Sequence, residues 1–171
     1  MTFALSRLND PEYFAQNRLP AHSDHRWFRN VDELAIDDSG YEQSLNGVWK
    51  FHYARNQHDV VDGFEQPDAK TDHWDDIPVP GHIQLQGYDR PHYANVQYPW
   101  DGHEQIEPGE IPTRYNPVAS YVRRFTLDRP AEDGERISIM VKGAESSIAL
   151  WLNGTFIGFS ADSFTPSEFD L

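Results

Sequence analysis

Residues 48–53 show the clearest short alternation of apolar and polar positions in the chain. Every second residue carries an aromatic side chain, and the set is Trp49, Phe51 and Tyr53. Lys50 and His52 fall between them. Because successive side chains of a strand point to opposite faces, the three aromatic side chains share one face. The pattern predicts a strand here, and we expect Trp74 to anchor the polar loop that follows.

Residues 118–160 carry the longest series of strand signals. Ile148, Leu150 and Leu152 alternate, and a second β-rich run follows at residues 155–159. The two runs are separated by Asn153-Gly154. Both turn residues tolerate positive φ, so this pattern predicts a tight β-hairpin. A similar alternation joins Ile137, Ile139 and Val141, and one more includes Tyr121 and Phe125.

Pro78 and Pro80 flank Val79, which indicates an edge strand or an extended segment, because proline cannot donate to a central ladder. Residues 81–117 are rich in glycine, proline and aromatic residues, as is typical of a long loop with a binding role. No amphipathic helix is evident. We therefore predict an all-β sandwich.

Residues 1–45 lack a sustained apolar period, although they contain isolated aromatic residues such as Tyr13 and Trp27. This composition predicts an irregular N-terminal arm. Two interpretations stay open: an arm that lies across another surface, and a partly ordered terminus. The predicted division is an arm at residues 1–45 and a β-sandwich domain at residues 46–171.

The composition of the 171 residues narrows the function classes. With 14 basic and 28 acidic residues, the formal net charge is −14, and the acidic residues are spread evenly. Nucleic acid and anionic membrane are therefore poor partners. The chain has no cysteine, no run long enough to span a bilayer and no secretory leader pattern. We expect a cytoplasmic protein.

Local motifs show no catalytic apparatus. The G-x-S-x-G, H-E-x-x-H and glycine-rich phosphate-loop patterns are absent, and the eight histidines lack a metal-ligand spacing. Glu104, Glu107 and Glu110 fit a solvated acidic loop better than a catalytic pair.

One loop has the composition of a sugar-binding surface, because aromatic rings stack on pyranose C–H faces while amides and carboxylates bind hydroxyls. Its residues are Tyr93, Asn95, Tyr98 and Trp100. Asp162 follows the predicted hairpin and could join them. The alternative is that these are core aromatic residues and turn-forming polar ones.

Several collinear blocks resemble the opening of the large bacterial β-galactosidases of glycoside hydrolase family 2. They are NRLPAH at 17–22, WFRN at 27–30, SLNGVWKF at 44–51, IPVPGHIQ at 77–84, GYD at 87–89, PHYANVQYP at 91–99, LWLNG at 150–154, GFS at 158–160, and DS at 162–163 leading into PSEFDL at 166–171. The resemblance covers nearly the whole chain from Asn17.

The resemblance implies a jelly-roll domain of the galactose-binding type, preceded by an arm used in subunit assembly. It places the acid/base glutamate, the nucleophilic glutamate and the magnesium ligands in parts of the enzyme beyond this chain, so the segment alone is expected to be inactive. Asn95 and Asp162 match residues that contact the galactosyl group. Asp162 also matches a ligand of a bound sodium ion.

The family's sandwich continues beyond the block that ends at Leu171, so we expect a truncated sandwich with an unpaired edge. Such an edge predicts self-association or pairing with a neighbouring copy. The expected partners are the remainder of the β-galactosidase or a second copy of the chain, in a homo-oligomer. The leading hypothesis is a fragment of a retaining β-galactosidase that acts on galactosides such as lactose. Two alternatives stay open: a free-standing carbohydrate-binding module, and an assembly or complementation segment.

Overall fold

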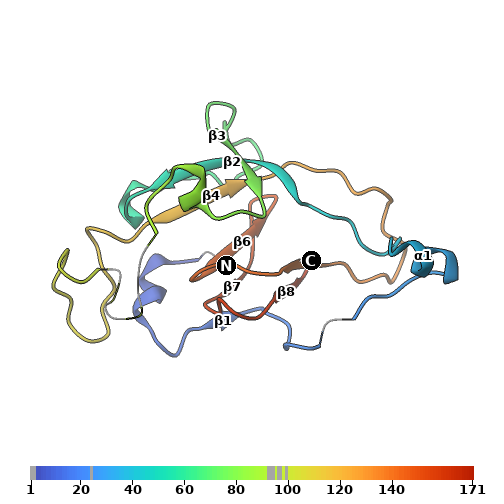
Figure 1. Cartoon of the computed structure of the whole chain (residues 1–171), viewed down its shortest axis with the longest axis horizontal. Helices are drawn as coiled ribbons and strands as arrows, with labels where there is room; N and C mark the ends of the chain where they lie inside the picture. Colours follow the sequence, from blue (N-terminus) through green and yellow to red (C-terminus); the bar gives the residue numbers. More distant parts are fainter. Residues whose placement is uncertain (1–2, 24, 92–94, 96–97, 99) are drawn as a thin grey trace.

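The computed structural model describes residues 3–23, 25–91, 95, 98 and 100–171. Strands dominate, and they are joined by long loops and a few short helical turns (Figure 1). The strands are β1 (Ala15–Gln16), β2 (Gly47–Ala54), β3 (Asp75–Val79), β4 (Val118–Val122), β5 (Ser138–Val141), β6 (Ile148–Leu152), β7 (Thr155–Ser160) and β8 (Ser167–Asp170). The helical elements are η1 (Leu5–Asn9), α1 (Val31–Ile36), η2 (Gln57–Asp59) and η3 (Ile83–Gln86).

One antiparallel sheet has the order β3-β2-β4, with β2 at its centre. The alternation read from the sequence places the aromatic residues of β2 as predicted. Phe51 is almost fully buried and its ring lies 5.0 Å from that of Tyr121 on β4. On the opposite face, the His52 ring lies 5.2 Å from that of the buried Trp74. The edge position predicted from Pro78 and Pro80 is confirmed, since β3 pairs with β2 alone in the described sheet.

The predicted hairpin is confirmed in strands β6 and β7. Leu152 pairs with Thr155 across the turn, and Asn153 and Gly154 both have positive φ, at 51° and 80°. The register shifts between Leu150 and Trp151, as a β-bulge requires. The turn residues supply the backbone twist that two-residue hairpins prefer.

The N-terminal segment pairs with the sandwich by its backbone. Ala15 and Gln16, which form β1, pair with Ser160 and Phe159 at the end of β7. Two residues farther along, Arg18 forms an isolated antiparallel bridge with Phe169 of β8. Residues 15–18 therefore lie beside β7 first and β8 second, and they connect the β1-β7-β6 sheet to the β5-β8 pair.

Aromatic residues of the arm also pack on β7. The Phe3 and Tyr13 rings stack on that of Phe159, with centroids 5.2 Å and 5.1 Å away. By contrast, the side chain of Trp27 is mostly exposed. The arm thus lies across the hairpin in its first part, and its aromatic residues do not all share that role.

A small aromatic core joins the two layers of the sandwich. Phe64, in the loop after β2, contacts Trp74 on one side and Trp151 of β6 on the other, at 6.1 Å and 5.8 Å. The most deeply buried apolar residues are Phe51, Ala54, Trp74, Ile77, Phe159 and Phe169. The all-β prediction is confirmed by this arrangement.

Helix α1 is a short surface element with no buried residue. The Asn30 side chain caps it by accepting hydrogen bonds from the backbone N–H groups of Asp32 and Glu33. Its six residues are too few to show the amphipathic period that a sequence search detects. None of the helices in the described ranges has the length and hydropathy that a membrane crossing needs.

Candidate functional site

Asp162 lies in the short loop that joins β7 to β8, and its carboxylate organises this loop. Its Oδ1 atom accepts hydrogen bonds from the backbone N–H groups of Phe164 at 3.0 Å and Thr165 at 3.2 Å. Its Oδ2 atom accepts a hydrogen bond from the Thr165 hydroxyl. These local contacts form an Asx-type turn, in which a side chain substitutes for a backbone acceptor.

A second group on this carboxylate comes from the N-terminal arm. The Arg18 Nη1 atom lies 3.2 Å from Asp162 Oδ2, in an ion pair that spans 144 positions of sequence. The Arg18 side chain exposes 11% of its surface and that of Asp162 exposes 33%. The site is therefore a partly buried carboxylate with one face open to solvent.

These donors stabilise the ionised form of Asp162. The hydrogen bond from the Thr165 hydroxyl, followed by that from the Phe164 N–H, lowers the pKa of Asp162 from its ordinary 3.8 to about 2, and Arg18 contributes further. The carboxylate is consequently anionic at neutral pH. An anionic, partly exposed acceptor is suited to hydroxyl groups and cations rather than to proton donation.

Asn95, the second residue assigned by resemblance, lies in an exposed turn of the long loop at 81–117. Its amide can both donate to and accept from a sugar hydroxyl. Among the contacts of the described residues, none joins Asn95 to Asp162. Tyr93, which the sequence grouped with Asn95, lies outside the described residues.

Two aromatic residues of the same loop form a parallel stack. The centroids of the Tyr98 and Trp100 rings are 5.1 Å apart with an interplanar angle of 5°, and Tyr98 is 66% exposed. A flat exposed ring of this kind can receive the apolar face of a pyranose. Both residues belong to the loop whose composition predicted a sugar-binding surface.

The acidic residues of this loop include one with a clear structural role. Glu104 accepts hydrogen bonds from the backbone N–H groups of Thr113 and Arg114, at distances of 2.8–3.1 Å. The bond from Arg114 is the main cause that lowers the pKa of Glu104. Glu104 thus joins two parts of the same loop by hydrogen bonds. This structural role fits the predicted acidic loop better than a catalytic pair.

Two of the described histidines take part in ordinary polar contacts. His22 Nε2 lies 2.7 Å from Glu168 Oε2, and His103 Nε2 lies 2.8 Å from an Arg90 nitrogen. His92 falls outside the described residues. Within the described ranges, no three or more His, Cys, Asp or Glu side chains gather as a metal site would require.

The sodium ion implied by the resemblance can be tested against the contacts of Asp162. Both oxygens already accept two hydrogen bonds or charged contacts each, which uses the roughly four acceptor sites of a carboxylate. A cation would have to displace one of these donors and take further ligands from elsewhere. The described residues do not by themselves form a sodium site.

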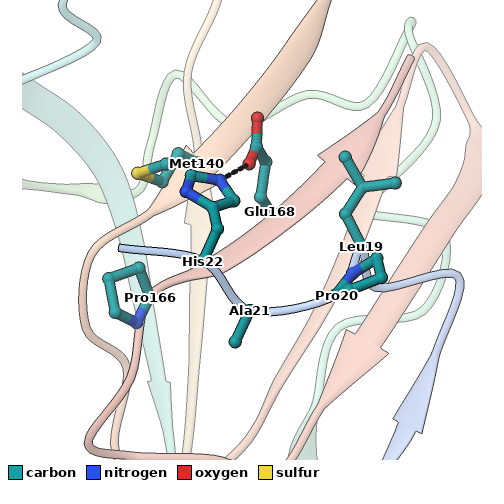
Figure 2. Close-up of a pocket in the computed structure, with 7 residues that line it drawn as sticks. All are labelled: Leu19, Pro20, Ala21, His22, Met140, Pro166 and Glu168. Atoms are coloured by element: carbon teal, nitrogen blue, oxygen red, sulfur yellow. Dashed lines mark hydrogen bonds and ion pairs between the residues drawn. The ribbon is translucent and has the colours of Figure 1, made fainter. Parts of the chain in front are cut away.

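A small pocket lies where the arm crosses β8. Figure 2 shows His22 of the arm directed at Glu168 of β8, with Met140 and Pro166 flanking it. The hydrogen bond from Ser138, followed by that from His22, lowers the pKa of Glu168. The pocket holds only about 10 Å³, enough for about one water molecule and far too small for a sugar.

Arg18 is the residue of this site that sequence reasoning missed. It lies in the block at 17–22 that carried the family resemblance, yet nothing in its local pattern names a partner. Its contact with Asp162 depends on the pairing of residues 15–18 with β7 and β8. Local periodicity cannot report such a contact, because the two residues approach only in the folded chain.

Comparison with known proteins gives several similar chains. The chain is 49% identical over 168 residues to a "Beta-galactosidase" of Halalkalibacterium halodurans, which covers 98% of the chain and 16% of that protein. It is 44% identical over 164 residues to a "Beta-galactosidase" of Streptococcus thermophilus, covering 96% of the chain and 16% of that protein. With a "Beta-galactosidase large subunit" of Latilactobacillus sakei the identity is 42%, over 96% of the chain and 28% of that protein.

The chain therefore spans about a sixth to somewhat over a quarter of the curated relatives it matches. A family model described as "Glycosyl hydrolases family 2, sugar binding domain" matches residues 42–171. That match takes in all of the strands except β1. The chain belongs to the family of glycosyl hydrolase family 2 sugar-binding domains.

Proposed function

We propose that the chain is the sugar-binding domain of a retaining β-galactosidase that hydrolyses terminal β-D-galactosides such as lactose. The observation that carries this proposal is the 42–49% identity to three β-galactosidases over almost the whole chain. Retention requires two carboxylates about 5–5.5 Å apart, one as acid/base and one as nucleophile. On this proposal both catalytic glutamates, together with the magnesium ligands, belong to the remainder of the enzyme.

Within that enzyme, Asp162 and Asn95 contact the galactosyl group. The support for Asp162 is chemical, since its carboxylate is ionised and one third exposed, and a sugar hydroxyl could bind there by displacing one of the present donors. The support for Asn95 is its exposed position in the aromatic loop. A sodium ion at Asp162 belongs to the same proposal and requires rearrangement of the donors around the carboxylate.

The proposed partners are a galactoside and the remainder of the β-galactosidase, with assembly into a homo-oligomer. The even spread of acidic residues supports a partner other than nucleic acid. A cytoplasmic location completes the proposal, as expected from the sequence.

Hydrolysis of a nitrophenyl β-D-galactoside tests this function. A longer polypeptide that carries this domain followed by the remainder of a family 2 enzyme should release nitrophenol, and the 171-residue chain alone should not. Absence of turnover by the longer polypeptide would contradict the proposal. Turnover by the purified chain alone would contradict the placement of the catalytic glutamates.

The same preparations separate two other functions. A free-standing carbohydrate-binding module would bind galactose on its own, with a change in tryptophan fluorescence on titration. A complementation segment would restore activity to a partner polypeptide that lacks this region. We expect binding by the isolated chain to be weak, because a few polar contacts without a surrounding pocket rarely offset the cost of association.

A further inference from the structure

We infer that Arg18 of the N-terminal arm is a positioning residue of the sugar site, holding the Asp162 carboxylate and its loop in the geometry that binds a galactosyl group. The inference rests on the proposed function, and it adds a residue to which the resemblance assigned no role. It also gives the arm a part in substrate binding.

The Arg18 guanidinium is directed at a single short segment. Its Nη1 atom contacts Ser160 Oγ at 3.4 Å and Asp162 Oδ2 at 3.2 Å. Its Nη2 atom donates to Thr165 Oγ1 at 2.6 Å and to the Pro166 carbonyl at 3.2 Å. One planar cation thus joins the end of β7, the loop and the residue that precedes β8.

Thr165 links the guanidinium to the carboxylate a second time. Its hydroxyl oxygen accepts from Arg18 Nη2, and the same hydroxyl donates to Asp162 Oδ2. Because a hydroxyl has one proton, acceptance from Arg18 directs that proton toward Asp162. Arg18 therefore orients the hydroxyl that donates to Asp162 Oδ2.

Hydrogen bonds made by the two neighbours of Arg18 hold its backbone in place, which limits the positions that the guanidinium can take. Asn17 Nδ2 donates to the Ile157 carbonyl at 2.8 Å, and the Leu19 N–H donates to the Glu168 carbonyl at 2.8 Å. The Arg18 side chain is about nine-tenths buried. Charged donors that are already in place before the ligand binds can hold a carboxylate in the geometry that binding requires.

The experiment compares Arg18→Met with Arg26→Met in the longer, active polypeptide. Arg26 is a matched control, since it lies in the same arm and pairs with Asp37 and Glu42. For a nitrophenyl β-D-galactoside we expect Arg18→Met to raise KM by about tenfold, as loss of one charged hydrogen bond would, with a smaller change in kcat. Arg26→Met should leave KM within about twofold.

Two further variants keep the test decisive if Arg18→Met fails to fold. Thr165→Val removes the hydroxyl link at nearly constant volume and should raise KM in the same direction by a smaller factor. Arg18→Lys retains the charge but not the forked donors, and should recover part of the affinity. In a double-mutant cycle, Arg18→Met should add little to the KM of Asp162→Asn, because both changes disrupt one unit.

The readouts distinguish this inference from the function on which it rests. If Asp162→Asn raises KM but Arg18→Met and Thr165→Val only lower the thermal midpoint, Arg18 has a structural role alone and the inference is overturned. Fully additive effects of Arg18→Met and Asp162→Asn would overturn it as well. If the unmodified polypeptide neither binds nor hydrolyses the galactoside, the proposed function itself fails.

Discussion

The aromatic ring of Phe169 on β8 lies against the α-carbon of Gly158 on β7. A side-chain carbon built on Gly158 would lie 2.5 Å from Phe169 Cε1 and 2.7 Å from the carbonyl oxygen of Gln16. Phe169 is fully buried, and Gln16 belongs to the arm strand β1. The absence of a side chain at residue 158 therefore lets β7, β8 and the arm meet at one point.

Gly158→Ala should destabilise the domain by about 1–3 kcal/mol, because the added methyl group overpacks this contact. Chemical denaturation measures the change. Gly143→Ala is the matched control, since nothing lies within 4 Å of its added carbon, and it should have little effect or stabilise slightly. Equal denaturation midpoints for the two variants would show that β7 and β8 are not packed through Gly158.

Phe51→Ala should cost about 3–5 kcal/mol, the usual range for removal of a buried aromatic side chain. Phe51 is 1% exposed, and its ring lies 4.6 Å from that of Tyr88 in the long loop. Truncation should therefore loosen this loop as well as the sheet, which hydrogen exchange can follow. Val48→Ala, on the same strand but 56% exposed, is the control and should cost less than about 1 kcal/mol.

The contribution of Asp162 to stability should depend on pH in a defined direction. Its pKa is about 2 in the folded domain against an ordinary 3.8, so between these values the unfolded chain binds more protons. The stabilisation is present above about pH 4 and is lost as the pH falls toward 2. The difference in denaturation midpoint between the unmodified chain and Asp162→Asn should accordingly narrow in acid, and a constant difference would contradict the prediction.

On the proposal that a sodium ion binds at Asp162, replacement of this residue should weaken the dependence of the longer polypeptide's activity on sodium. The change Asp162→Asn removes the anionic oxygen that a hard cation prefers. Activity measured while sodium replaces a large organic cation at constant ionic strength reports the effect. Asp76→Asn, at an exposed residue that pairs with Lys50, is the control. An unchanged sodium response in Asp162→Asn would remove the metal assignment and leave the sugar contact to be tested separately.

Local sequence patterns were sufficient where a strand carries its own signal. The alternation at residues 48–53 predicted the faces of β2, and Asn153-Gly154 predicted the turn between β6 and β7. Both signals act over a few neighbouring residues, through side-chain alternation and tolerance of positive φ. Asp162 was assigned to the sugar site through the sequence blocks shared with glycoside hydrolase family 2. Its local pattern showed only that an aspartate follows the predicted hairpin.

The sequence by itself therefore determined the all-β class, the hairpin of β6 and β7, and the family. Only the tertiary structure decided that residues 15–18 pair with β7 and β8, and that Arg18 meets Asp162 across 144 positions. Strand β1 contains two residues, too few for an alternating pattern, and its partners are supplied by the other end of the chain. Contacts between distant segments are stabilised by backbone pairing and burial in the folded domain, and neither leaves a periodic signal in the arm itself.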